Sequence, residues 1–304
     1  MIVGLIKTLR PHQWVKNLFV LAPMFFNKEL FLPSSGRPNF VVVGQAIAAT
    51  AIFCMLAGAV YTINDLVDVE ADRQHPVKRE RPIASGEVQE GIAWAMSVLL
   101  VVLSIGCAFL LNAGFAIVAA FYFVENLAYT FRLKKIAYLD VVMIAFGFTL
   151  RVVAGGFATG THVSFYMLAC TALLALFLGF GKRRHELAGD NVEKQRSALR
   201  AYNPQALNVA LALTGGATVV TYVAYTLDPS TRSFFNSNYL WLTVPFTLFG
   251  IVRFLFLVSG RAGRGRKSES PTQEMLRDVP FVLNIVLWLV VLVAIVYRLR
   301  PSVG

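Results

Sequence analysis

The sequence predicts an all-α fold: a polytopic membrane protein with a bundle of about nine transmembrane helices, forming one domain over residues 1–304. Two observations carry this prediction. The chain is 57% hydrophobic and only 15% charged, and its mean hydropathy is +0.62. Apolar runs long enough to cross a bilayer also recur along it. They place helices near residues 14–32, 41–63, 89–110, 114–131, 137–157, 163–181, 205–226, 238–258 and 279–299.

The first of these runs is interrupted by Pro23, Lys28 and Glu29. The segment before it, Met1 to Arg10, is typical of a short amphipathic helix lying on the membrane surface. A cleavable signal peptide is not expected.

Basic residues alternate between the loops, which predicts the orientation. The segments 64–88, 132–136, 182–204 and 259–278 carry 4, 3, 6 and 5 Lys or Arg, whereas the intervening loops carry one or none. The N-terminus and every charged loop are therefore expected on the cytoplasmic side of the cell membrane, with the C-terminus outside. The glycine- and arginine-rich stretch 259–272 is expected to contact lipid headgroups.

The net charge of +11 fits topogenic loops, and it also fits a surface that handles several phosphates. Nucleic acid is not an expected partner, because no soluble module is present to bind it. The three cysteines lie in predicted spans without metal-ligand spacing, and the four histidines do not form a zinc-binding pair.

The most informative segment follows the second predicted helix directly. Asn64, Asp65, Asp68 and Asp72 occupy its start, and the three aspartates would project within about 60° of one another on a helix. Hard oxygen ligands in this number suit Mg²⁺, which usually takes one or two carboxylates together with substrate phosphates. The bases that follow, which include Lys78, Arg79 and Arg81, suit those phosphates.

Two further groups of bases stand at expected cytoplasmic helix ends. One follows Tyr129 and holds Lys134 and Lys135, before Asp140 begins the next helix. The other precedes the first span and holds Lys16 and Asn17. Each group is a candidate for phosphate binding, and each has a plain alternative role as a membrane anchor.

Arg151 lies about three turns inside a predicted span. An arginine there costs about 2.5–3.5 kcal/mol on insertion scales and usually faces a cavity. We expect it to contact an anion; a structural pair with the intramembrane acid Glu125 is the alternative. In loop 182–190, Lys182 and Arg183 are phosphate candidates. Glu186 and Asp190, four residues apart, would hold a second Mg²⁺ or orient these bases.

These motifs together resemble the UbiA superfamily of intramembrane prenyltransferases, along almost the whole chain. The resemblance implies Mg²⁺ and a diphosphate bound at the mouth of a cavity open to lipid. Within the superfamily, the chain is most similar to the decaprenyl-phosphate phosphoribosyltransferase branch. The stretches that carry this are Arg10 to Asn17, Asp72 to Ile83, the helix around Arg151, and Lys182 to Glu186.

This branch implies Mg²⁺-dependent transfer of 5-phosphoribose from phosphoribosyl pyrophosphate to decaprenyl phosphate, for arabinan and cell-wall precursors. Asp65, Asp68 and Asp72, helped by Asn64, would hold the metal and diphosphate. The phosphate candidates above would bind the remaining phosphates, and Tyr129 and Glu186 are added as substrate contacts. Homo-oligomers are compatible with the family. The acids of loop 182–190, Glu186 and Asp190, depart from the paired aspartates common in the superfamily.

Two other functions remain open from the sequence. A prenyltransferase would move a polyprenyl chain from its diphosphate to an aromatic acceptor, and the metal motif alone does not exclude it. A transporter for an anionic lipid would use the intramembrane arginine, but the clustering of acids at one face argues against alternating access.

Overall fold

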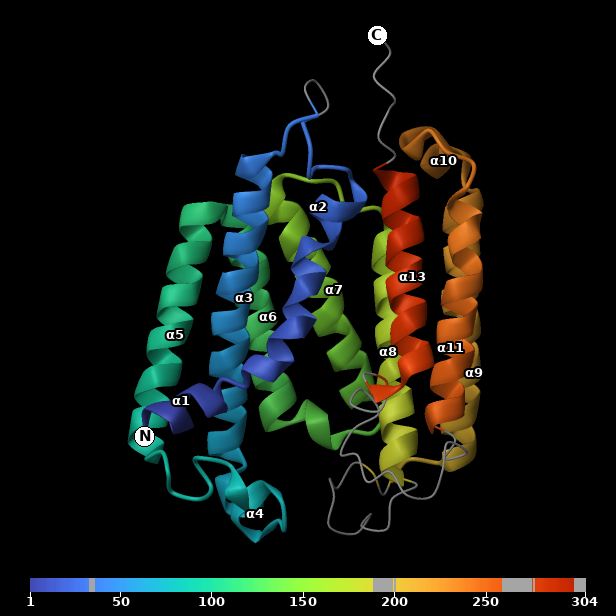
Figure 1. Cartoon of the computed structure of the whole chain (residues 1–304). Coiled ribbons are helices and arrows are strands. Elements are labelled where there is room, and N and C mark those ends of the chain that lie inside the picture. The colour runs from blue at the N-terminus through green and yellow to red at the C-terminus, as the bar shows by residue number, and fades with distance from the viewer. Residues whose placement is uncertain (33–35, 188–198, 200, 259–274, 276, 298–304) are drawn as a thin grey trace. The chain divides into compact units, whose positions relative to one another are not determined.

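Eight helices of the described chain are long and apolar enough to cross a membrane (Figure 1). The computed structural model describes residues 1–32, 36–187, 199, 201–258, 275 and 277–297. Within these residues β-structure is limited to one isolated bridge, between Phe31 and Pro38. The spanning helices are α3 (Phe40–Val67), α5 (Glu90–Leu111), α6 (Ala113–Phe131), α7 (Leu139–Thr159), α8 (Phe165–Leu187), α9 (Pro204–Leu227), η6 with α11 (Leu240–Thr243 and Val244–Val258) and α13 (Val279–Val296).

The first predicted span, 14–32, forms differently from a regular helix. It consists of a 3₁₀ segment, η1 (Pro11–Leu21), and a short α-helix, α2 (Ala22–Phe26). Pro23 has no backbone N–H to donate, which accounts for part of this break. The amphipathic segment predicted before it forms α1 (Ile2–Thr8), which buries Gly4 and Thr8 and exposes Ile2 and Val3.

Contacts within the chain divide it into two groups of helices, Met1–Val163 and Ser164–Gly304. The prediction of a single domain stays a prediction.

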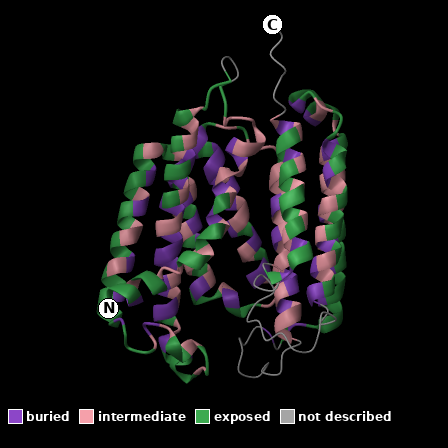
Figure 2. Ribbon diagram, viewed as in Figure 1, coloured by how far each residue is buried: buried purple, intermediate pink, exposed green. Residues whose placement is uncertain are grey.

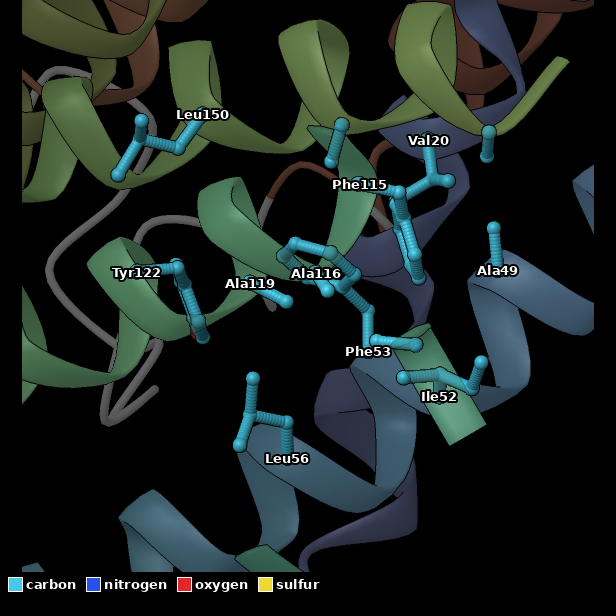
Figure 3. Packing of buried hydrophobic residues seen from close by; sticks show 13 residues of the cluster. Val20, Ala49, Ile52, Phe53, Leu56, Phe115, Ala116, Ala119, Tyr122 and Leu150 are labelled. Atoms are coloured by element: carbon cyan, nitrogen blue, oxygen red, sulfur yellow. The ribbon is translucent and has the colours of Figure 1, made fainter. Parts of the chain in front are cut away.

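In the first group, α3 packs on α5, α6 and α7, and η1 contacts both α3 and α7. Phe53, Phe115 and Tyr122 pack at its centre (Figure 3), with ring centroids 5.1 Å apart for Phe53 and Tyr122. Apolar residues along α5 are exposed, as the green parts of that helix show in Figure 2, and suit contact with lipid.

The segment after α3 is short, helical and anchored. Helix α4 (Val69–Gln74) follows Asp68, which is the C-terminal cap of α3, and the 3₁₀ turn η2 (Lys78–Glu80) comes next. Ile83 and Val88 are then buried against Leu66 and Val69. This small apolar cluster holds the acid- and base-rich loop against the end of α3.

In the second group, α8 packs on α9, and α11 packs on α13. Phe177 and Phe254 lie 4.9 Å apart between ring centroids. Arg253 donates two hydrogen bonds to Asp278, at 3.0 and 2.7 Å, and Asp278 also caps the N-terminus of α13. The short helix α10 (Pro229–Phe235) follows α9.

Replacing Gly155 by alanine should destabilise the first group of helices. A Cβ atom at Gly155 would lie 2.0 Å from the carbonyl oxygen of Val20, because η1 packs directly on α7 at this point. Backbone must move to relieve that contact, so we expect a loss of about 1–3 kcal/mol. Thermal unfolding in detergent measures it. Gly106→Ala on α5 is the control, since a Cβ there meets nothing within 4 Å; equal melting temperatures for the two variants would contradict the prediction.

Candidate active site

The aspartate motif lies where α3 ends and α4 begins. The residues Asp65 and Asp72 are both 3% exposed, whereas the side chain of Asp68 is 32% exposed. The structure differs from the predicted single helix face in one respect. Because α3 stops at Val67, Asp65 and Asp72 stand on different helices.

Two arginines neutralise the buried pair of aspartates. Arg81 places Nη1 between them, 2.9 Å from Oδ1 of Asp65 and 2.6 Å from Oδ2 of Asp72. Arg10 donates from Nη2 to the same oxygen of Asp65 at 2.5 Å. Arg10 has a left-handed backbone, with φ at +51°, and it stacks over the ring of Tyr61. The N-terminal segment thus contacts the acid motif through Arg10.

Lys134 neutralises the third aspartate. Its ammonium group lies 2.7 Å from both carboxylate oxygens of Asp68 and donates to Oδ1 of Asn64 at 3.2 Å. Lys134 is on the 3₁₀ turn η3 (Leu133–Lys135), which joins α6 to α7. The loop that the sequence suggested for phosphate binding is therefore in direct contact with the acid motif.

The residues present fit a site in which two carboxylates bind one divalent cation. A single cationic nitrogen of Arg81 already contacts both Asp65 and Asp72, so their oxygens converge on one positive centre. The described residues do not form a group of three acid, cysteine or histidine ligands around one point. Two carboxylates completed by phosphate oxygens is an arrangement that Mg²⁺ accepts.

A second polar cluster surrounds Arg151 inside the helices of the first group. Arg151 donates from Nε to Asn17 at 2.8 Å, from Nη1 to the carbonyl of Gly147 at 2.9 Å, and from Nη2 to the hydroxyl of Tyr122 at 2.7 Å. All three acceptors are neutral. Among the described contacts Arg151 makes no hydrogen bond to Glu125, although the two charges interact through space, so the alternative of a structural pair stays open.

Lys16 connects the two clusters electrostatically. Its ammonium group experiences the positive charges of both Arg151 and Arg10. No described residue forms a hydrogen bond or an ion pair with Lys16. Arg10 is paired with Asp65, but Lys16 has no carboxylate partner among the described residues, so the position beside Arg151 favours an anionic ligand.

The other predicted residues are placed as follows. Lys78 and Tyr129 are half-buried, and Arg79 and Lys135 are exposed. Arg79 and Lys135 make no ion pair with the aspartates in the described structure. Asp140 is fully buried at the first turn of α7.

In the second group of helices, Arg183 is 1% exposed and pairs with Glu186, whose other oxygen lies 4.0 Å from Lys182. Glu186 thus pairs with both neighbouring bases, and its predicted orienting role stays a prediction. Asp190 lies outside the described residues, and so does the stretch 259–272.

Arg10 and Tyr122 contact predicted site residues but were not themselves predicted as site residues from the sequence. Arg10 belongs to the N-terminal motif, and its position directly before a proline was the feature of the sequence that could have drawn attention to it. For Tyr122 the signal was its spacing of three residues from Glu125 on one helix face.

Replacing Tyr122 by phenylalanine should destabilise the protein, because it removes an acceptor from a buried guanidinium. A hydrogen bond to a charged group contributes about 1.5–3 kcal/mol. Thermal unfolding in detergent should show the loss. Tyr61→Phe is the matched control, because its hydroxyl has no hydrogen-bond partner among the described residues and its ring would remain under Arg10. Equal destabilisation by both changes would refute the assigned role of the Tyr122 hydroxyl.

Comparison with known proteins identifies the family. The model of the UbiA prenyltransferase family matches residues 20–269. The chain therefore belongs to the UbiA prenyltransferase family, and it is a multi-pass membrane enzyme of the transferase class.

Curated relatives narrow the comparison. The chain is 35% identical to the decaprenyl-phosphate phosphoribosyltransferase of Corynebacterium glutamicum, over 97% of this chain and 87% of that one. It is 36% identical to the enzyme of the same name from Mycolicibacterium smegmatis, over 98% and 93%. Among solved structures, a UbiA homolog from Archaeoglobus fulgidus bound to DMAPP and Mg²⁺ superposes with a TM-score of 0.70 at 19% identity, covering 97% of this chain and all of that one.

Proposed function

We propose that the protein transfers 5-phosphoribose from phosphoribosyl pyrophosphate to decaprenyl phosphate and releases diphosphate. The observation that carries this proposal is the polar cluster around Arg151 and Lys16, beside the acid motif. A prenyl donor would place a hydrocarbon chain next to its diphosphate, and hydrocarbon gains nothing from buried cations. A phosphorylated sugar and a phosphorylated acceptor both do. The names of the curated relatives support the same donor and acceptor.

The chain's own residues would first bind the donor diphosphate. Arg10, Arg81 and Lys134 are held on carboxylates in this structure, and each can exchange a carboxylate oxygen for a phosphate oxygen. Asp65 and Asp72, with Asp68 and Asn64, would hold Mg²⁺, and the Archaeoglobus homolog, which is bound to Mg²⁺, supports metal binding by this fold. Bound Mg²⁺ would neutralise charge on the leaving diphosphate.

The transfer itself needs no general base. An oxygen of the acceptor phosphate, already an anion, attacks the anomeric carbon; that carbon–oxygen bond forms as the bond to diphosphate breaks. Attack from the face opposite the leaving group converts an α-linked donor into a β-linked product. Arg151 and Lys16 would bind the remaining phosphates.

The test uses the purified full chain with Mg²⁺, labelled phosphoribosyl pyrophosphate and decaprenyl phosphate. Label should move into the lipid phase and should stop moving when EDTA is added. If no label moves in folded protein, the proposal fails. A polyprenyl diphosphate with an aromatic acceptor then tests prenyl transfer, and a proteoliposome flux assay tests transport.

We also propose that the acid motif faces the cytoplasm of a cell-membrane protein, where its soluble donor is made. The asymmetry of basic residues between loops supports this orientation. The lipid-linked product would supply cell-wall arabinan synthesis. Labelling of single cysteines introduced at Arg79 and at Arg232, from either side of sealed cells, tests the orientation.

A further inference from the structure

Glu125 is a buried acid whose role the proposed transfer has not yet used. It is 7% exposed and lies on α6, one turn from Tyr122 on the same buried face. Phe121 and Val124, on the other side of the helix, are exposed. An acid inside a span is costly, and it usually faces the bundle interior and marks a substrate path.

The carboxylate of Glu125 retains free capacity to accept hydrogen bonds. Its oxygen Oε2 accepts one hydrogen bond, from Nδ2 of Asn126 at 2.7 Å. Oε1 accepts none from the described residues, and it is not among the side-chain atoms that are both fully buried and unpartnered. The neighbouring Arg151 directs its three described hydrogen bonds to Asn17, Gly147 and Tyr122 instead. Glu125 therefore offers acceptors that the described protein does not use.

This acceptor adjoins the cationic cluster. A Cβ atom built on Gly147 would lie 3.6 Å from Nη1 of Arg151 and 3.7 Å from Oε2 of Glu125. The missing side chain of Gly147 thus leaves room where the guanidinium and the carboxylate approach each other. Lys16 and Arg10 continue the polar path from Arg151 to Asp65.

The chemistry of a carboxylate at this point selects its ligand. It repels phosphate oxygens, and a prenyl chain offers it no hydrogen-bond donor. Hydroxyl groups of a sugar are donors, and a charged acceptor binds them strongly. We propose that Glu125, held by Asn126, accepts hydrogen bonds from the ring hydroxyls of the pentosyl diphosphate donor and so selects a sugar over a prenyl group. This inference rests on the proposed function, because it names how that donor is recognised.

The experiment compares two ligands that differ by the sugar phosphate, phosphoribosyl pyrophosphate and inorganic diphosphate. Their affinities are measured calorimetrically with the full chain in detergent and Mg²⁺. Glu125→Ala should weaken binding of phosphoribosyl pyrophosphate about 10- to 100-fold, as expected for hydrogen bonds to a charged group. Binding of diphosphate, which has no sugar hydroxyl, should not weaken. Glu125→Gln, which keeps one acceptor oxygen, should lie between wild type and Glu125→Ala.

Gly147→Ala is a second variant that removes no polar group. Its methyl group would occupy the space between Arg151 and Glu125 without a clash, so it should weaken the sugar-containing ligand selectively. Glu70→Gln, an exposed acid on α4, is the control and should change neither affinity.

Two results overturn the inference. One is an equal change for both ligands in Glu125→Ala, which would assign Glu125 to phosphate electrostatics or to structure. The other is an unchanged affinity for phosphoribosyl pyrophosphate in both Glu125→Ala and Gly147→Ala. Failure of the proposed function looks different: wild-type protein itself would then bind phosphoribosyl pyrophosphate no better than diphosphate and would transfer no label.

Discussion

Transfer activity is expected to fall about 100- to 1000-fold when Asp65 is replaced by asparagine, comparable to the loss of a group that stabilises transition-state charge. Asp65 is buried and accepts from both Arg10 and Arg81. The amide is nearly the same shape but carries no charge. Arg10 therefore loses its carboxylate partner, and Arg81 keeps only Asp72. The change also removes one ligand from the proposed metal site. The label-transfer assay measures the loss as kcat/KM.

The matched control for this change is Glu70→Gln. Glu70 lies on α4 in the same segment, but it is exposed and pairs with Arg73 on the surface. It should keep activity within about 2-fold, as exposed ion pairs contribute little. Raising the Mg²⁺ concentration should recover part of the activity of Asp65→Asn, because a weakened metal site fills by mass action. An Asp65→Asn variant that retains more than a tenth of wild-type kcat/KM would remove Asp65 from the proposed site.

Replacing Arg151 by lysine is expected to lower kcat/KM about 100-fold although the charge is kept. The guanidinium reaches three acceptors in three fixed directions, on η1, α6 and its own helix α7. A lysine ammonium is a point charge on a flexible stem and does not reproduce this fork. Asn17 and Tyr122 would lose their shared partner, and the anion site next to Lys16 would lose its geometry.

Arg253→Lys separates this effect from a loss of stability. Arg253 also lies within a spanning helix, and it makes a two-point ion pair with Asp278. Arg253→Lys should lower the melting temperature of the protein, because the partner of Arg253 is Asp278, the N-terminal cap of α13. It should leave kcat/KM within a few-fold of the wild-type value. If both variants lose activity in proportion to their melting temperatures, Arg151 has a structural role only.

Hydropathy predicted most of the fold, because a spanning helix needs about 20 apolar residues and leaves a clear run. It did not predict the irregular first segment. Segment η1 packs closely on Gly155 of α7 through Val20, and this contact joins residues 135 positions apart in the chain. The local amino-acid composition cannot predict such a contact.

The sequence did not predict how the residues of the candidate site pair. The spacing of Asp65, Asp68 and Asp72 predicted one face of one helix. In the structure α3 ends before Asp68 and α4 begins after it, so the aspartates take different basic partners. Asp65 and Asp72 share Arg81, and Asp68 takes Lys134. These pairings join residues 16, 9 and 66 positions apart, so only the fold could assign them. The roles of Lys16, Lys134 and Arg151 as phosphate contacts remain predictions.

The pairing of every aspartate in the motif with a base has a consequence for inhibitor design. A chelating fragment that arrives with its metal would displace Arg81 and leave its guanidinium without a partner. A bare diphosphate mimic would draw Arg10 and Lys134 away and leave carboxylates exposed to one another. A compact molecule that presents anionic oxygens together with a bound cation avoids both penalties, because each displaced internal charge then finds a new partner on the same scaffold.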